Sequence, residues 1–154
     1  MKRLALFLAV LFYSGLAKAQ SLAFSFNQLD SLQRIEKRKV VVFVYTGWCN
    51  YCKAMEQKVL KQAEIQKLIQ DQYYLVALNA EDKNPISYRG KIFAYKNNKG
   101  IHELALALAS QQKQLSFPFL ALINAQDELL YQQEGFIDVI TLKKVLFYFG
   151  TNEQ

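Results

Sequence analysis

The sequence predicts an α/β fold in which a mixed sheet is covered by helices on both faces. In the first half of the chain, helical patterns alternate with short runs of β-branched and aromatic residues, which indicates parallel strands joined by helices. In the last third, two such runs are separated only by a turn at residues 124–127, which indicates an antiparallel hairpin. A sheet that contains both kinds of pairing is mixed.

The first 19 residues have the three parts of a secretory signal peptide. A basic start precedes an apolar run over residues 4–16 that is too short to span a bilayer, and small residues favour cleavage after Ala19. The residue after the cut is Gln20 rather than cysteine, so the sequence does not indicate a lipid anchor. We therefore expect an exported protein, soluble after cleavage, in which residues 20–154 form one domain.

The charge pattern does not favour a nucleic-acid partner. Cleavage would remove three of the 19 basic residues, Lys2, Arg3 and Lys18, and lower the formal net charge from +6 to +3. The remaining Lys and Arg are scattered among acids and glutamines, which is typical of a solvated surface. We therefore expect no nucleic-acid partner, and no later segment is long and apolar enough to span a membrane.

The elements of the first half follow from their periodicity. A helix is predicted over residues 27–39, because apolar residues recur there at helical spacing. Residues 40–45 are six consecutive β-branched or aromatic residues, the pattern of a central strand buried on both faces. The next elements, in order, are a helix at 49–60, a helix at 63–70 and a strand at 73–78.

The stretch after these elements is less regular. Residues 79–85 form a polar loop, and residues 87–99 are rich in Lys, Asn, Gly and aromatic side chains without a clear period. Residues 102–111 are rich in Ala and Leu and predict a helix. The pattern then becomes regular again, with a strand at 119–123, its hairpin partner at 128–133 and a closing helix at 141–149.

The two cysteines lie three residues apart at the predicted junction between strand 40–45 and the following helix. In the loop-entropy model, a disulfide that closes so small a ring stabilises a fold by roughly 2 kcal/mol, against about 3 for a fifteen-residue loop. Chemistry therefore explains the pair better than stability. Cys49 would lie beside unpaired amides at the start of the helix, which stabilise a thiolate, so we expect it to be the attacking nucleophile. Cys52, on the same helical face, would resolve the mixed disulfide that Cys49 forms.

Three other interpretations of the pair are possible. A zinc site needs about four ligands, whereas the chain offers two cysteines and His102. A c-type haem attachment needs histidine directly after the second cysteine, where Lys53 stands. An inert structural disulfide is the third. We expect redox exchange, with no metal and no bound cofactor.

The segment Trp48–Lys53, with the sequence WCNYCK, resembles the active-site segment of the thioredoxin superfamily, and in particular that of exported thioredoxin-like proteins of Gram-negative bacteria. The hydrophobic strand 40–45, Pro118 before the strand 119–123 and Gly135 after the hairpin also match. The resemblance implies a thioredoxin-like three-layer α/β/α fold and a periplasmic thiol–disulfide oxidoreductase. It also implies that the stretch 87–114 is a helical insertion before the cis-Pro strand.

The resemblance further implies a site. Pro118 should follow a cis peptide bond and lie against the active-site disulfide, and Trp48, Phe117 and Pro118 should line the groove for partner chains. The partners would be exported proteins with cysteines or disulfides, and a membrane electron donor would re-reduce the protein if it works as a reductant.

Three departures from the common pattern matter. Phe43 stands where many thioredoxins have a buried aspartate, so Glu36, Glu56 or water would have to take the proton from Cys52. Asn50-Tyr51 replaces the Gly-Pro of thioredoxin itself, which leaves the redox potential open. A bulky Phe117 precedes the proline, which would narrow the groove.

Two alternative functions stay open. One is a binding or chaperone module on a thioredoxin fold with an incidental Cys pair. The other is a peroxidase, for which Thr46 is the nearby candidate. For His102, a surface or capping position is favoured over titration beside the thiolate, and the aromatic residues 147–149 of the closing helix are expected to pack in the core.

Overall fold

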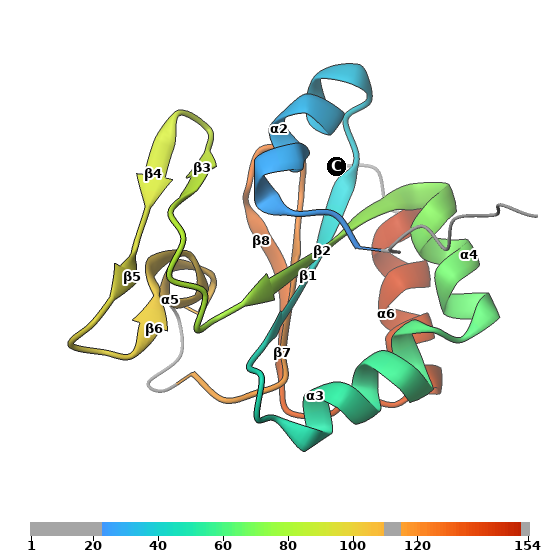
Figure 1. Ribbon diagram of the computed structural model, residues 1–154. Helices are drawn as coiled ribbons and strands as arrows, with labels where there is room; N and C mark the ends of the chain where they lie inside the picture. The colour runs from blue at the N-terminus through green and yellow to red at the C-terminus, as the bar shows by residue number, and fades with distance from the viewer. Residues whose placement is uncertain (1–22, 110–114, 152–154) are drawn as a thin grey trace, which may run out of the picture.

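A mixed four-stranded sheet forms the centre of the structure, a computed structural model that describes residues 23–109 and 115–151 (Figure 1). The strands are β1 (Lys39–Tyr45), β2 (Tyr73–Asn79), β7 (Phe119–Ile123) and β8 (Leu129–Glu134), in the order β2-β1-β7-β8. β1 is parallel to β2 and antiparallel to β7, and β7 is antiparallel to β8. The predicted mixed sheet is confirmed.

Helices cover both faces of this sheet, so the predicted three-layer arrangement is also confirmed (Figure 1). Alternate residues of β1 enter different cores, as the period of a strand requires: Val42 packs on one face and Phe43 on the other. The first face carries α2 (Phe26–Ile35) and α5 (Glu103–Leu108). The second face carries α3 (Asn50–Met55), the π-helix η1 (Glu56–Leu60), α4 (Ala63–Gln72) and α6 (Val139–Thr151).

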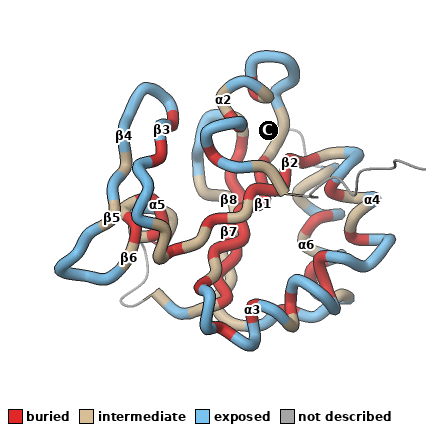
Figure 2. The backbone as a smooth tube through the Cα atoms, viewed as in Figure 1, coloured by how far each residue is buried: buried red, intermediate tan, exposed pale blue. Residues whose placement is uncertain are grey.

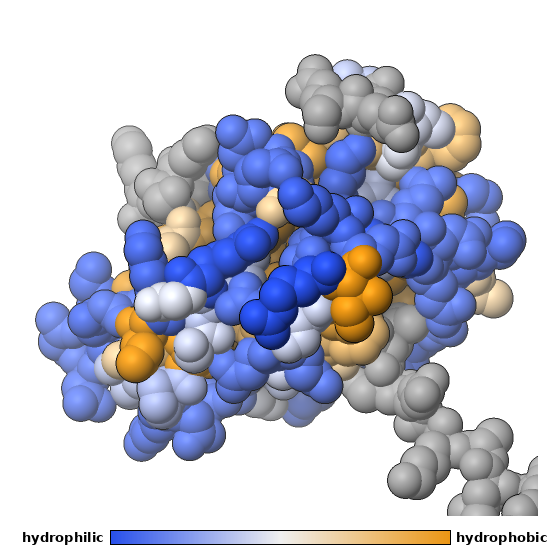
Figure 3. Space-filling view, turned by 90° about the horizontal axis from the view of Figure 1, so that it is seen from above, coloured by the Kyte–Doolittle hydropathy of each residue, from blue (hydrophilic) through white to orange (hydrophobic). Residues whose placement is uncertain are grey.

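The two edge strands of the sheet differ in burial, since five of the seven residues of β2 are buried and none of β8 is. β1 and β7 are central and almost wholly buried, whereas every residue of the edge strand β8 is partly exposed (Figure 2). The run of six apolar residues that predicted a strand buried on both faces is therefore explained by the central place of β1. Seen from above, the surface is mainly hydrophilic, with small separate hydrophobic patches (Figure 3).

The first helix ends earlier than predicted. The sequence pattern extends to residue 39, but α2 ends at Ile35, which is exposed. The buried side chain of Gln33 accepts a hydrogen bond from the backbone N–H of Arg38 (3.0 Å) and donates one to its carbonyl (2.7 Å). These two bonds hold the chain in the turn that leads into β1, so the helix cannot continue.

The predicted helix 49–60 is also modified. It is α-helical to Met55 and then π-helical over η1, and Cys49 is its N-cap rather than its first residue. Two helices are longer than predicted: α4 by two residues, and α6 by two at each end. The expected packing of residues 147–149 is wrong for two of them, since Phe147 and Tyr148 are exposed.

The stretch 87–114, expected to be a helical insertion, is helical only over α5 in its described part and also contains strands that the sequence did not indicate. β3 (Ile86–Tyr88) pairs with β4 (Lys91–Phe93), and β5 (Tyr95–Lys96) pairs with β6 (Ile101–His102). Ladders of two or three residues are too short to give a visible period. The predicted helix 102–111 is α5, which ends at Leu108, and residues 110–114 lie outside the described residues, as does the predicted signal peptide.

His102 was expected at a surface or a capping position. It caps the start of α5, but it does not lie on the surface. Its side chain is fully buried, and its Nδ1 accepts a hydrogen bond from the N–H of Leu104 (3.2 Å). The backbone N–H of His102 donates to the carbonyl of Ala80 (2.8 Å), and this bond holds the start of α5 against the end of β2.

Candidate functional site

The two cysteines lie where β1 gives way to α3. Thr46, Gly47 and Trp48 form the turn, and the N–H of Cys49 donates to the carbonyl of Thr46 (3.3 Å). Cys49 and Cys52 are joined in a disulfide. The Cys49 sulfur accepts a hydrogen bond from the N–H of Cys52 at 3.0 Å, so it takes the place of an N-cap oxygen at the start of the helix.

In this disulfide form both sulfur-bearing residues are covered. Cys49 is 4% exposed and Cys52 2%, and both pack in the second core with Phe43 and Met55. The predicted order, with Cys49 the more exposed, is observed. The difference in exposed fraction between the two cysteines is small, because the disulfide holds both side chains against the core.

Trp48 projects from the turn and is held at its polar edge by Glu81. The side chain is 66% exposed, and its indole N–H donates to Glu81 Oε1 at 2.9 Å. The N–H of Gly47 donates to the other carboxylate oxygen at 3.3 Å. The N–H of Glu81 donates to Asn79 Oδ1 (3.0 Å), which orders the chain just after β2.

Glu81 is a site residue that the sequence reasoning missed. A signal was available, because the carboxyl ends of parallel strands meet at the same edge of a sheet. β1 and β2 are parallel, so polar residues just after β2 reach the turn that follows β1.

Phe117 and Pro118 lie on the other side of Trp48. The Phe117–Pro118 peptide bond is cis, as predicted. The ring of Phe117 meets that of Trp48 edge to face, with 6.2 Å between centroids. The carbonyl of Pro118 accepts a hydrogen bond from the N–H of Gly135 (2.8 Å). This bond joins the proline and the glycine that match the thioredoxin pattern.

Comparison with known proteins identifies the family. A family model described as a thioredoxin-like domain matches residues 26–150. The chain belongs to this thioredoxin-like family. With a disulfide between the two cysteines of the C-x-x-C segment, this thioredoxin-like protein is a thiol–disulfide oxidoreductase.

Solved structures share the thioredoxin-like fold at low sequence identity. A DsbH oxidoreductase is 19% identical, with a TM-score of 0.56 and coverage of 84% of this chain and 85% of that one. A thioredoxin from Thermus thermophilus is 14% identical, with a TM-score of 0.59 and coverage of 83% and 85%. A disulphide isomerase from Xylella fastidiosa Temecula1 is 13% identical, with a TM-score of 0.56 and coverage of 86% and 95%. No curated protein sequence matches the chain.

The position of the aspartate that many thioredoxins bury is apolar in this thioredoxin-like protein. Phe43 is buried and stacks on Tyr45, with 5.7 Å between ring centroids. Of the three expected substitutes, Glu36 is wrong: it lies before the start of β1, at the opposite end of the strand from the disulfide, and pairs with Arg38 at 2.7 Å. Glu56 is one turn beyond Cys52, and its N–H donates to the Cys52 carbonyl.

Two further side chains of the site differ in exposure. Tyr51, between the cysteines, is 70% exposed. The Thr46 hydroxyl is buried and makes no hydrogen bond within the part of the chain that the structure describes, so nothing joins it to the Cys49 sulfur. Within the described residues there is no cluster of three or more metal-binding side chains, and no helix has the length and apolarity of a membrane span.

Proposed function

We propose that this thioredoxin-like protein reduces disulfides of exported proteins with its Cys49–Cys52 dithiol. The observation that carries the proposal is the position of the pair. Cys49 caps α3 and its sulfur accepts the Cys52 N–H, the kind of interaction that would stabilise a thiolate once the disulfide is reduced. Redox exchange needs no further cofactor.

The reaction would proceed in two exchanges. The Cys49 thiolate attacks one sulfur of the partner disulfide, so that a mixed disulfide forms and the other partner sulfur leaves as a thiolate. Cys52, after losing its proton, attacks the Cys49 sulfur and releases the second partner thiolate. Two electrons pass to the partner, and the Cys49–Cys52 disulfide is left. A membrane dithiol donor would then return two electrons.

Exposed aromatic side chains would form the groove for the partner. Trp48 and Tyr51 are exposed on either side of Cys49, and Phe117 packs against Trp48 next to Pro118. Aromatic surfaces of this kind bind an extended chain by burying apolar area, and the Cys49 sulfur between them would react with the disulfide of the bound partner. Glu56 or water would accept the Cys52 proton.

Cys52→Ser tests the exchange. The variant keeps the nucleophile and lacks the group that releases it, so mixed disulfides with exported proteins should accumulate on a non-reducing gel of the periplasmic fraction. Cys49→Ser should trap far fewer partners, because Cys52 is farther into the helix than the capping position.

If both variants fold and neither traps a partner, the proposal fails. The protein would then be better explained as a binding or chaperone module with an incidental Cys pair. Thiol oxidation by peroxide that is faster than exchange with a disulfide substrate would favour the peroxidase.

The redox potential tests the direction of transfer. Equilibration of the Cys49–Cys52 pair against glutathione should give a potential of about −270 mV, the value typical of thioredoxins. A value of about −120 mV would make the protein an oxidant of its partners. That result would reverse the direction and leave the exchange chemistry unchanged.

A further inference from the structure

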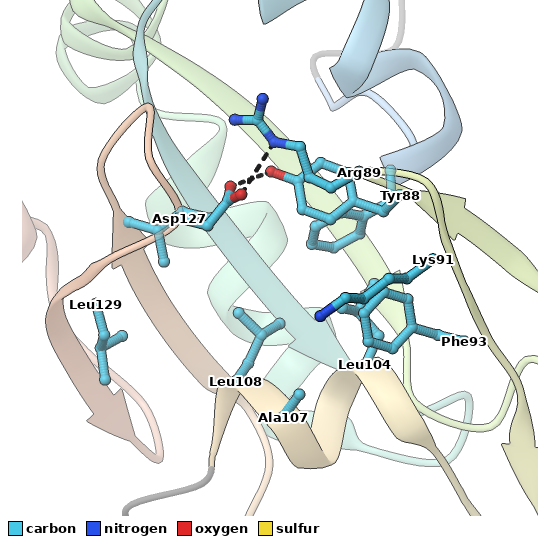
Figure 4. A pocket seen from close by; sticks show the side chains of 11 residues that line it. Tyr88, Arg89, Lys91, Phe93, Leu104, Ala107, Leu108, Asp127 and Leu129 are labelled. Carbon is cyan, nitrogen blue, oxygen red and sulfur yellow. Dashed lines mark hydrogen bonds and ion pairs between the residues drawn. The ribbon is translucent and has the colours of Figure 1, made fainter.

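The insertion, α2 and the sheet line a cavity of about 330 Å³ that is open to solvent on one side and lies on the α2 face of the sheet (Figure 4). Ile123 of β7 and Leu129 of β8 contribute from the sheet, and Phe93, Leu104 and Leu108 contribute from the insertion. Ile123 pairs with Val40 at the start of β1, whereas the disulfide follows the end of that strand. The cavity and the redox site are therefore at opposite ends of the sheet.

One side of the cavity carries polar groups that satisfy one another. Asp127 accepts hydrogen bonds from the Tyr88 hydroxyl and from Arg89 Nε, the latter at 2.9 Å (Figure 4). Arg89 Nη2 also donates to the carbonyl of Ala125 at 2.6 Å. Burial raises the pKa of Tyr88, so its phenol stays protonated and remains a donor. The charge of Arg89 is therefore already balanced.

These polar groups are held in a costly backbone conformation. Arg89 and Asp127 have φ of 53° and 68°, in the left-handed region that side chains other than glycine rarely adopt. Both residues belong to tight turns, and their side chains join the β3–β4 turn to the β7–β8 turn. The wall of the cavity is thereby fixed before any ligand arrives.

Lys91 is the exception among the charged residues that line the cavity. Its side chain runs beside Phe93, and its ammonium group points toward Leu108 (Figure 4). Within the described residues this ammonium group has no ion pair and no hydrogen bond. Lys91 is itself exposed, so among the described residues that line the cavity it supplies an unpaired positive charge on the solvent-facing side of an apolar pocket.

We propose that this cavity binds a small aliphatic monocarboxylate, with the chain among the apolar side chains and the carboxylate on Lys91. The volume is at the lower end of the range for ligand pockets, roughly 300–1,000 Å³, which fits a short chain. The Lys91 ammonium would balance the single negative charge of such a ligand. Lys91 would neutralise only one of the two negative charges of a phosphate dianion. The second negative charge would lie in the same cavity as the Asp127 carboxylate, so a carboxylate ligand fits better.

Titration of the full chain with octanoate, followed by calorimetry and by amide NMR shifts, tests the site. We expect saturable binding of one octanoate per chain, with the largest shifts at Phe93, Leu104 and Leu108. Because Lys91 is exposed, its ion pair with a carboxylate is screened by solvent, so Lys91→Met, which keeps an apolar stem and removes the charge, should weaken binding about three- to five-fold. Lys99→Met removes a charge from the β5–β6 turn outside the cavity and should leave the affinity unchanged.

Two ligand controls and a second variant complete the test. 1-Octanol should bind wild type about as weakly as octanoate binds Lys91→Met, and octylammonium should not bind. Leu108→Trp should fill the cavity and abolish octanoate binding, with the fold checked by circular dichroism. Equal octanoate affinities for wild type and Lys91→Met would overturn the proposal, as would shifts confined to the exposed apolar residues of α6, or no saturable binding.

Discussion

At the scale of single residues, Glu81 connects the end of β2 to the turn that carries the redox pair. Its two carboxylate oxygens accept hydrogen bonds from the Trp48 indole and from the Gly47 backbone. Trp48 is otherwise exposed, so the bond from its indole and the Phe117 ring orient its side chain, while the Gly47 bond holds the backbone before it. Glu81 is thus a positioning residue for the proposed groove, one that acts through Trp48.

We predict that Glu81→Ala will free the indole while the fold persists. Loss of two partly exposed hydrogen bonds should lower the free energy of unfolding by about 1–2 kcal/mol. The chain has one tryptophan, so fluorescence reports this side chain alone, and its quenching by acrylamide should increase. Asp82→Ala removes an equal charge from the next residue and should leave quenching unchanged. Equal quenching in wild type and Glu81→Ala would show that Phe117 alone positions Trp48.

At the scale of elements, Tyr73 at the start of β2 joins the sheet to α6. Its hydroxyl donates to the carbonyl of Leu146 at 2.5 Å, and the residue is 2% exposed. Burial raises the pKa of Tyr73 to about 12, from an ordinary value of 10. The phenol therefore ionises more easily in the unfolded chain than in the folded one. Its contribution to stability is complete below pH 10 and is lost as the pH rises through 12.

We accordingly predict a loss of stability in alkali. The urea midpoint of wild type should fall between pH 10 and 12, and it should fall less steeply in Tyr73→Phe, which has no proton to lose. The variant should be less stable at pH 7 by about 1 kcal/mol, because the Leu146 carbonyl loses its donor. Tyr51→Phe changes an exposed tyrosine and serves as the control. A parallel fall in wild type and Tyr73→Phe would contradict the assignment.

Some helix and strand boundaries follow from the local sequence pattern, and others do not. The helix predicted to residue 39 stops at Ile35 because the Gln33 side chain binds the backbone of Arg38, and apolar spacing carries no record of such a bond. The strands β3 to β6 were absent from the prediction because each pairs over only two or three residues. By contrast, β1 and β7 were predicted to within one residue, since each is a continuous apolar run through the core.

At the scale of the whole molecule, the sheet separates two sites. β1 has seven residues, which at about 3.3 Å per residue span roughly 20 Å. The disulfide follows its carboxyl end, and the cavity of the insertion lies near its amino end on the α2 face. The two sites share the central strands but no side chains, so substitutions in the cavity should leave disulfide exchange intact.

The sequence by itself determined the mixed sheet, the three layers and the place of the redox pair at the junction of β1 and α3. These depend on apolar periodicity and on neighbours within a few residues, which a single sequence displays. Tertiary structure decided the bond between Trp48 and Glu81, 33 residues apart, the burial of His102 under the end of β2, and the cavity around Lys91. Each of these arises where segments distant in the chain meet, and the pairing of such segments depends on how the layers pack rather than on any local pattern.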